Sequence, residues 1–261
     1  MTKSTVRFTP WVGPRYQQGI HGLRILVVCE SHYGAKEHER PTVTPEIVKA
    51  LALGQTHPQA TAKLRRHPHF TKIMASILNT RKRFSKSDKS EFWHSIAYYN
   101  FIQEFIPKAR KTPCDAAWER GKQPFTEVLG VLKPDLIVCY SKRNGRRVKA
   151  LTGDVPVAVV SHPSSHFSYS ASNPIIAEQM SLALQRKEQV PAPVDASALY
   201  KSWCDTTATA LPTPGKHLSM PGSLTLKAQR VDAMAVLDEL RPEYCSDCIA
   251  ESSAERPVNR V

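Results

Sequence analysis

The amino-acid sequence predicts an α/β domain with three layers, α/β/α, in which helices cover both faces of a mainly parallel central sheet of four strands. Two observations lead to this class: four short apolar runs rich in Val, Ile and Tyr, and helical segments that separate them. The runs do not alternate with polar residues, which is typical of strands buried on both faces. They are residues 24–29, 95–100, 135–140 and 155–161.

Segments with helical character fill each gap between these runs and follow the last one. The first gap holds two such segments, and the segment in the second gap contains Pro124, which predicts a break there. Because strands and helices alternate, we expect right-handed crossovers and parallel strands. Sheets of this kind bind ligands at the carboxyl ends of their strands. The helical segments are residues 45–53, 70–78, 114–132, 146–151 and 174–188.

Composition divides the chain into three regions. With 261 residues, of which 41% are hydrophobic, it is long enough for one or two domains. Residues 1–189 are predicted to form the α/β domain. A stretch rich in Pro and Ala then predicts a linker or wrapping arm over 190–222, and residues 223–261 are expected to form a C-terminal helix and a polar tail.

The sequence predicts a soluble protein that has no membrane partner. No apolar stretch reaches the roughly 18 to 20 residues that span a bilayer, and the N-terminus lacks the apolar core of a signal peptide. Of six cysteines, Cys29 and Cys139 lie inside predicted strands, which indicates buried thiols in a reducing compartment. We therefore expect a cytoplasmic protein, and a monomer because nothing in the sequence demands symmetry.

Positive charge is concentrated in the first part of the chain. The whole chain carries 36 Lys and Arg residues against 23 Asp and Glu, a formal net charge of +13. Residues 1–150 hold 27 of the basic residues and only 11 of the acidic ones. A basic surface of this kind is typical of nucleic-acid binding, but a solvated face that keeps a protein soluble carries similar charge.

Polar side chains follow three of the predicted strands at the point where each strand ends. Glu30 follows the first strand, Asn100 closes the second, and His162 follows the fourth. In a parallel sheet these ends meet at one edge, so we expect the three side chains to share a site. They suit hydrolysis of a glycosidic bond to a planar base. The carboxylate orients water or stabilises a cationic sugar, the amide reads the base edge, and the imidazole stabilises the leaving base.

The order of these motifs resembles that of the uracil-DNA glycosylase superfamily. The best match is His162-Pro163-Ser164, which follows an apolar strand as in the second motif of that superfamily. The loop at Glu30 stands in the place of its first motif, and the match covers roughly residues 20–190. The resemblance implies a uracil-DNA glycosylase-like fold and a monofunctional DNA N-glycosylase, a hydrolase without cofactor or metal.

The resemblance also implies a role for each side chain near the strand ends. Glu30 and His162 would be catalytic: Glu30 would position or activate water, and His162 would hydrogen-bond the pyrimidine O2 as negative charge develops there. Asn100 would hydrogen-bond the Watson–Crick edge of the base, and Tyr33 would stand beside its C5 edge. The base-recognition residues are thus Ser31, His32, Tyr33 and Asn100.

DNA is the partner that the resemblance implies, with a pyrimidine nucleotide flipped out of the strand. Ser164 and Ser165 would hold phosphates, and Phe167 or Tyr169 would occupy the space that the flipped nucleotide vacates. Basic residues after the third strand add candidate phosphate contacts, and both single- and double-stranded DNA stay open. The predicted DNA-binding residues are Ser164, Ser165, His166, Phe167, Arg143, Arg146 and Arg147.

Three departures from the pattern of the superfamily affect the predicted substrate. Cys29 stands where the first motif has Gly, His32 stands where Pro is usual, and Ser165-His166-Phe167 replaces Pro-Leu-Ser. Because these changes lie at the mouth of the pocket, ordinary uracil need not be the substrate. The resemblance implies two substrate classes, uracil-type bases and hypermodified cytosines such as glucosylated hydroxymethylcytosine, which some bacterial relatives remove in antiviral defence against phages. Either reaction leaves an abasic site.

The sequence also leaves other functions open. One is a non-catalytic nucleic-acid-binding module that keeps the pocket without the chemistry. The pair Cys245-x-x-Cys248 has a spacing that suits zinc or an iron–sulfur cluster, but no second cysteine pair lies near the N-terminus, so ordinary thiols are expected. A phosphatase or nucleotide hydrolase is disfavoured, because the chain has no Gly-rich phosphate loop and no Asp cluster for a metal.

Overall fold

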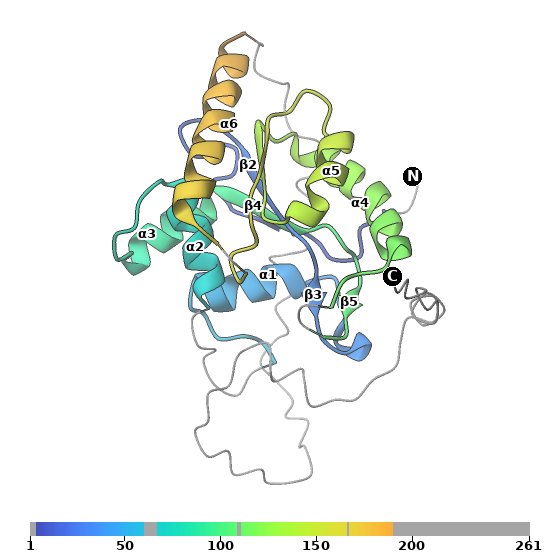
Figure 1. Cartoon of the computed structure of the whole chain (residues 1–261). Helices are drawn as coiled ribbons and strands as arrows, with labels where there is room; N and C mark the ends of the chain where they lie inside the picture. The colour runs from blue at the N-terminus through green and yellow to red at the C-terminus, as the bar shows by residue number, and fades with distance from the viewer. Residues whose placement is uncertain (1–3, 60–66, 109–110, 166, 190–261) are drawn as a thin grey trace, which may run out of the picture.

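The computed structural model describes residues 4–59, 67–108, 111–165 and 167–189 (Figure 1). These ranges fall within the predicted α/β domain. His166, the predicted linker or arm at 190–222, and the predicted helix and tail at 223–261 with Cys245 and Cys248 lie outside the described residues.

A five-stranded mixed sheet forms the centre of the described chain. Four of its strands run parallel to one another and coincide with the four predicted strands, so the expectation of a mostly parallel α/β sheet is confirmed. The fifth strand pairs antiparallel with the second predicted strand and is too short to give a periodic signal in the sequence. The predicted count of four strands is therefore one short. The strand order is β1 (Trp11–Val12), β4 (Ile96–Asn100), β2 (Ile25–Cys29), β6 (Leu136–Cys139) and β7 (Val157–Val159).

A second, two-stranded sheet lies beyond the ends of the central strands. It pairs β3 (His32–Tyr33) in parallel with β5 (Phe105–Ile106), and a 3-10 turn, η1 (Lys36–His38), follows β3. Both strands follow closely after β2 and β4 along the chain. The segment that contains Glu30 is therefore held between two sheets instead of being an open loop.

The order of the parallel strands creates a switch point between β2 and β6. From β2 the chain crosses to β4 on one side, and it then returns past β2 to reach β6 and β7 on the other side. Where connections leave in opposite directions, a crevice opens at the carboxyl ends of the two strands, and open α/β sheets bind their ligands there. In this sheet the crevice is expected next to Cys29 and Cys139, the last residues of β2 and β6.

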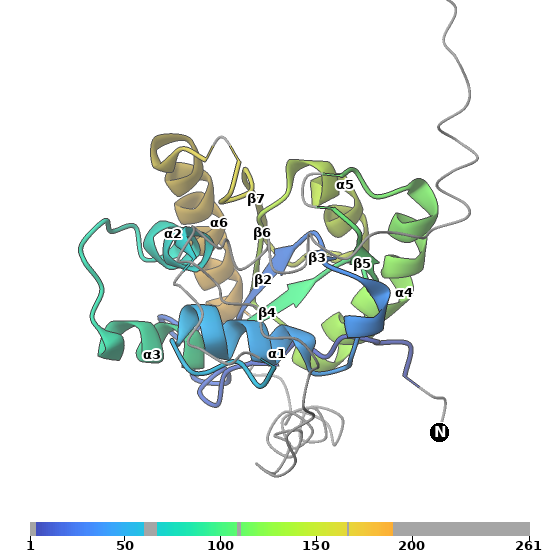
Figure 2. The same ribbon diagram turned by 90° about the horizontal axis from the view of Figure 1, so that it is seen from below.

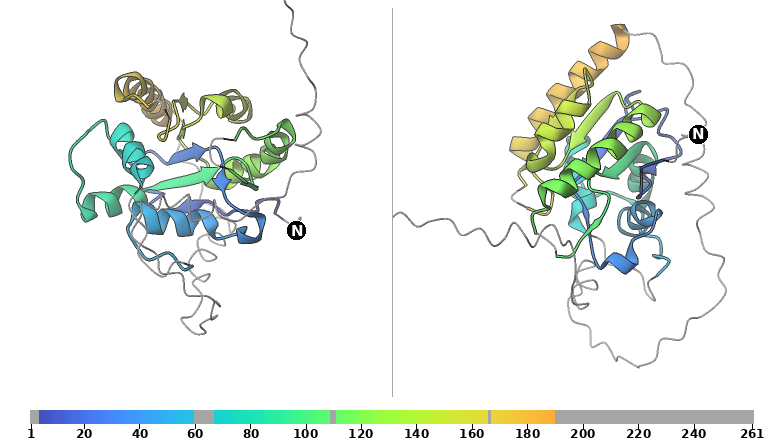
Figure 3. Two further views of the ribbon diagram at one scale, coloured as in Figure 1. Left: turned by 60° about the horizontal axis from the view of Figure 1, so that its bottom comes forward. Right: turned by 90° about the vertical axis from the view of Figure 1, so that its right-hand side faces the viewer.

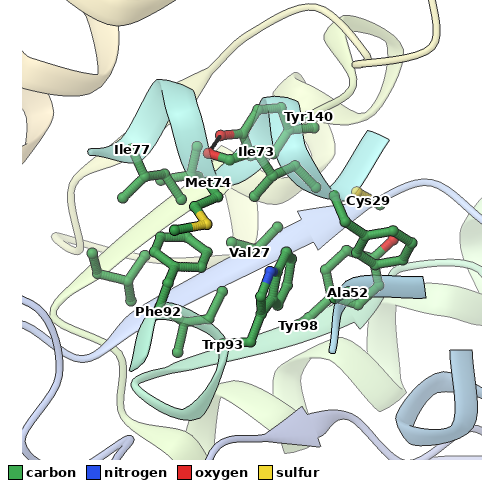
Figure 4. Packing of buried hydrophobic residues seen from close by; sticks show 14 of the residues in the cluster. Val27, Cys29, Ala52, Ile73, Met74, Ile77, Phe92, Trp93, Tyr98 and Tyr140 are labelled. Carbon is green, nitrogen blue, oxygen red and sulfur yellow. Dashed lines mark hydrogen bonds between the residues drawn. The ribbon is translucent and has the colours of Figure 1, made fainter. Parts of the chain in front are cut away.

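One face of the sheet is covered by α2 (Pro68–Ile77), α3 (Lys86–His94) and α6 (Tyr169–Gln189). Alternate strand residues, such as Val27 and Tyr98, pack with these helices in a single core, part of which Figure 4 shows. Every other residue of a strand points to this face, because side chains alternate across a sheet.

The opposite face is covered by α4 (Asp115–Leu132) and α5 (Lys142–Leu151). Its core contains Val28 and Cys139 together with Val148 of α5. Figures 2 and 3 show the two sets of helices on opposite sides of the strands. Because both faces are buried, the strands read as unbroken apolar runs, which is the signal that identifies them in the sequence.

Each predicted helical segment falls on a helix, and the differences lie at the ends. The range 45–53 corresponds to α1 (Val43–Ile47) and the π-helical turn η2 (Val48–Ala52). The range 146–151 forms only the second part of α5, which begins at Lys142 because the Ser141 side chain caps it. Among the described residues, no helix combines the length and the apolar character needed to cross a bilayer.

Two expectations about helices need correction. The predicted break at Pro124 is wrong, because α4 continues through it while Phe125 and Val128 are buried in the core on the next turn. The helix α3 is absent from the sequence prediction although its start carries a capping box, in which Ser85 and Asp88 bond each other's backbone N–H groups. Its remaining residues are mostly polar, so periodicity does not reveal it.

Candidate active site

Backbone register brings the polar ends of the strands to one edge of the sheet. Cys29 lies opposite Asn100 in the pairing of β2 with β4, and the Ile102 N–H donates to the Glu30 carbonyl at 2.9 Å. On the other side of β2, the Tyr140 N–H donates to the Val28 carbonyl at 2.8 Å. The residues that follow β2, β4 and β6 are thus neighbours.

Glu30 is almost fully buried and is held by residues that follow β6. Its Oε2 accepts a hydrogen bond from Ser141 Oγ at 2.8 Å, and its Oε1 accepts one from Arg143 Nη2 at 2.6 Å. Ser141 Oγ also accepts a bond from the Asn144 N–H at 3.1 Å and so caps α5. The carboxylate therefore stands at a helix N-terminus, where the helix dipole favours negative charge. This contact spans the switch point between β2 and β6.

Asn100, the last residue of β4, and Ser31, which follows Glu30 in the chain, carry buried polar side-chain atoms. Asn100 is 2% exposed, and its backbone carbonyl oxygen accepts a hydrogen bond from Gln103 Nε2 at 2.9 Å. Among the described residues, neither Asn100 Oδ1 nor Ser31 Oγ has a hydrogen-bond partner. An unpartnered buried polar atom costs about 1 to 3 kcal/mol, so such atoms are uncommon unless a ligand or water completes them. Two of them at the edge of the sheet that also holds the Glu30 carboxylate favour a binding site there.

His162 follows β7 and joins this edge from the other face of the sheet. Its Nδ1 accepts a bond from the Ser164 N–H at 3.1 Å, so in the neutral ring the proton is assigned to Nε2. Burial, together with the charges of Arg143, His67 and Lys72, lowers the pKa of His162 to about 4. The ring is therefore neutral at pH 7 and carries an N–H donor on Nε2. Arg143, which binds Glu30, is close enough to act on His162 as well.

His69 of α2 is a member of the site that sequence reasoning did not identify. Its ring centroid lies 5.0 Å from that of His162, and its Nε2 is 3.3 Å from the Tyr98 hydroxyl and 3.7 Å from Cys29 Sγ. Burial holds the pKa of His69 well below its usual range and raises the pKa of the Cys29 thiol. A neutral thiol is a poor nucleophile, so Cys29 is a wall of the site and not a reacting group.

His32 occupies a different environment from the one expected. Its Nε2 lies 2.8 Å from Thr44 Oγ1, and its ring packs 5.7 Å from Phe8 and 5.8 Å from Phe105. Burial lowers the pKa of His32 to about 3, so it is neutral. These contacts fix the start of the two-stranded sheet, and they are not contacts with Glu30 or Asn100. The contacts of His32 show a structural role at the start of this sheet. Its role in base recognition stays a prediction.

The remaining predicted residues lie in the segments that follow β2 and β7. Tyr33 is partly buried against the core of the α4 and α5 face, whereas Ser164 and Ser165 are exposed in a turn in which the Ser165 N–H donates to the His162 carbonyl at 3.0 Å. Phe167 is partly buried and packs on Tyr140, with ring centroids 6.3 Å apart. The predicted DNA-binding residue His166 is outside the described ranges.

The three arginines of α5 differ in their bonding partners and in their exposure. Arg143 binds Glu30 and also donates to Thr112 Oγ1 at 2.8 Å, with 47% of its side chain exposed. Arg147 stacks 4.8 Å over the Trp118 ring and donates to Asp115 at 3.2 Å. Arg146 is exposed. Of the three, Arg143 belongs to the site itself, and Arg146 is the most available for a phosphate.

Within the described ranges, no three His, Cys, Asp or Glu side chains converge as metal ligands. No protein-family model matches the chain, and no curated protein matches it at a significant level. The chemistry of the site is therefore inferred from the contacts of its own residues.

Proposed function

We propose that the protein is a DNA glycosylase that hydrolyses the N-glycosidic bond of a flipped-out pyrimidine nucleotide and leaves an abasic site. One observation carries this proposal: a buried carboxylate, a buried amide with an unpartnered oxygen, and a neutral imidazole with an N–H donor stand at the carboxyl ends of parallel strands of one sheet. They belong to Glu30, Asn100 and His162. A fold of three layers similar to that of uracil-DNA glycosylase is part of the same proposal.

In the proposed reaction the bond between C1′ of the sugar and the base nitrogen breaks, and the base leaves with the electron pair. Negative charge then develops on the base, where the Nε2–H of the neutral His162 donates a hydrogen bond to it. The sugar becomes cationic, and the carboxylate of Glu30 stabilises that charge. Water adds its oxygen to C1′ and releases a proton, which neutralises the base anion, so the products are the neutral free base and an abasic sugar.

The pocket would recognise the base through atoms that lack partners in the free protein. Asn100 Oδ1 is a buried acceptor, so it favours a base edge that presents an N–H group. Ser31 Oγ, next to Glu30, either donates to the substrate or holds the attacking water. Outside the pocket, the exposed Arg146, Ser164 and Ser165 are suited to bind phosphates.

The proposed substrates are uracil-type bases and hypermodified cytosines, the latter in defence against phages. The test is an alkali-cleavage assay on oligonucleotides that contain uracil, hydroxymethylcytosine or glucosylated hydroxymethylcytosine, with unmodified cytosine as the control. The proposal expects strand cleavage after alkali for at least one modified base and none for cytosine. Absence of cleavage for every modified pyrimidine contradicts it. We further propose a cytoplasmic monomer, which fits the free thiols of Cys29 and Cys139.

A non-catalytic nucleic-acid-binding module is the second candidate, and one observation favours it. Each oxygen of the Glu30 carboxylate already accepts a bond, one from Ser141 and one from Arg143, so part of its capacity is used for structure. The two candidates differ in the effect of Glu30→Gln, Asn100→Ala and His162→Ala. A glycosylase loses base release in these variants while DNA binding survives, whereas a binding module shows no base release even in the wild type.

A further inference from the structure

Two cations and two aromatic rings form a ridge beside His162. The ridge consists of Lys72, which lies in α2, of Arg81, which follows α2, of Phe167, which precedes α6, and of Tyr169, the first residue of α6. Lys72 Nζ lies 5.9 Å from the centroid of the Phe167 ring, and the Arg81 guanidinium lies 4.9 Å from that of Tyr169. The two rings are 5.2 Å apart and perpendicular, with an angle of 89°. One ring therefore presents its edge where the other presents its face.

The ridge is fixed to the proposed pocket by direct contacts. Lys72 Nζ donates to the Pro163 carbonyl at 2.7 Å, in the residue that follows His162. Phe167 packs on Tyr140, which follows β6. Beyond the ridge, Asn173 Nδ2 donates to Asn79 Oδ1 at 2.7 Å and ties α6 to the end of α2. The four ridge side chains are therefore held at a set position relative to His162.

The ridge carries positive charge that its described neighbours do not neutralise. In the part of the chain that the structure describes, no carboxylate lies within ion-pair distance of Lys72 or Arg81. Arg81 and its neighbour Arg83 are exposed. Phe167 and Tyr169 are partly exposed, and each has a cation over its ring. A ligand that matches this surface is anionic and has a flat aromatic part.

We propose that this ridge binds an unpaired nucleotide next to the one in the pocket, so that the protein binds single-stranded DNA in preference to an intact duplex. Base–aromatic stacking and a cationic track are the two elements by which proteins hold single strands. A guanidinium plane stacks on bases as it does on rings, so Arg81 extends the same surface. The location of the neighbouring nucleotide rests on the proposed function, whereas the binding of a single strand does not.

The packing of Phe167 also argues against its expected use as a wedge. A wedge must project into the space that a base leaves, but the Phe167 ring contacts Tyr140, Tyr169 and Lys72 around it. These contacts hold the ring in place, and its partial exposure leaves part of it available for stacking. A base can reach that surface only if it is not stacked between two neighbours in a duplex. Selection of an unpaired strand follows from this arrangement.

Binding and base release are measured separately on the full chain. Fluorescence anisotropy follows a labelled oligothymidine of about 15 nucleotides, near the site size of such surfaces, and the same strand paired with oligoadenosine. Tyr169→Ala and Phe167→Leu each remove one stacking ring. We expect each to weaken single-strand binding about 5- to 100-fold, and duplex binding less than about twofold.

Three further variants control for charge and for folding. Tyr169→Phe keeps the ring and is expected to bind single strands like the wild type. Arg81→Ala removes a phosphate contact. The negative slope of the logarithm of the binding constant against the logarithm of the salt concentration therefore becomes shallower by about 0.7. Lys122→Ala removes the same charge from α4, where Lys122 pairs with Glu119 at 2.5 Å, and is expected to leave the slope unchanged.

The outcomes separate this inference from the proposed function. Unchanged single-strand binding in Tyr169→Ala and Phe167→Leu overturns the ridge, and so does an equal loss for single strand and duplex. If the ridge variants lose single-strand binding but the wild type releases no base, the ridge stands and the glycosylase proposal fails. If the wild type releases a base and the ridge variants bind normally, the ridge alone fails.

Discussion

Ser141 Oγ donates a hydrogen bond of 2.8 Å to Oε2 of Glu30, and the two residues are 111 positions apart in the sequence. The bond joins the end of β2 to the start of α5 across the switch point of the sheet. Through its second bond, from the Asn144 N–H, the same oxygen also caps the helix. One hydroxyl group thus couples the stability of α5 to the position of the proposed catalytic carboxylate.

Ser141→Ala is expected to lower both stability and base release. Loss of the cap and of one donor to a buried carboxylate should reduce the free energy of unfolding by about 1 to 3 kcal/mol, measured in urea. Ser85→Ala is the matched control, because Ser85 caps α3 through the Asp88 N–H at 3.0 Å but has no contact with Glu30. It should lose about 1 kcal/mol and keep its base release. Equal base release in the two variants would separate Ser141 from the site.

Asn100→Ala is expected to separate function from stability. Removing an amide whose oxygen lacks a partner among the described residues relieves an unsatisfied group, so the free energy of unfolding should change by less than about 1 kcal/mol. Base release should fall by at least about tenfold, because the proposed hydrogen bonds to the base are lost. The readouts are urea unfolding and single-turnover base release. A strong loss of stability with normal base release would assign Asn100 to structure.

The neutrality of His162 predicts how stability depends on pH. The folded pKa of about 4 lies below the ordinary value of 6.5, so the unfolded chain binds a proton first as the pH falls. The stability linked to His162 is therefore complete above pH 6.5 and is lost between pH 6.5 and 4, by roughly 3 kcal/mol. Urea unfolding at several pH values measures this loss. His162→Asn should show a shallower dependence, while the buried His32 keeps its own contribution.

Gly145→Ala tests whether α5 must pack closely on β7. A Cβ at Gly145 would lie 2.4 Å from Cγ1 of Val159, so the helix that carries Ser141 and Arg143 has to shift. The expected cost is about 1 to 3 kcal/mol, together with a loss of base release. Gly130→Ala in α4 is the control, because nothing lies within 4 Å of its Cβ and alanine favours a helix. A neutral result at Gly145 would show that the placement of α5 is tolerant.

The sequence predicts the parallel strands well because each is buried on both faces and therefore reads as an apolar run. It does not reveal β1, whose two residues are too few for a period, or α3, whose polar residues hide a helix that begins at a capping box. Pro124 misleads, because the burial of Phe125 and Val128 holds α4 together despite the missing N–H. In each case tertiary packing decides what the local pattern leaves open.

The candidate site is predictable to the extent that it depends on strand ends. Glu30 and Asn100 can be identified because each stands at the carboxyl end of an apolar run, where the topology gathers ligands. His69 cannot be identified in this way, because it lies on a helix and its contact Cys29 is 40 residues away in the sequence. Ser141 directly follows the predicted strand 135–140, so the same rule points to its position, but its bond to Glu30, 111 residues away, cannot be read from the sequence. His32 shows the limit of proximity in the sequence: it lies two residues from Glu30, but its side-chain contact is with Thr44 and not with that carboxylate.

Quantification of free base by liquid chromatography, after incubation with a modified single-stranded oligonucleotide, addresses the role of Glu30 most directly. Wild type and Glu30→Gln are compared at saturating protein, with DNA binding measured in parallel. We expect the wild type to release the base. The Glu30→Gln variant should bind DNA equally well but release the base at least about a hundredfold more slowly. Equal release by both proteins, or none by the wild type, contradicts a glycosylase centred on this carboxylate.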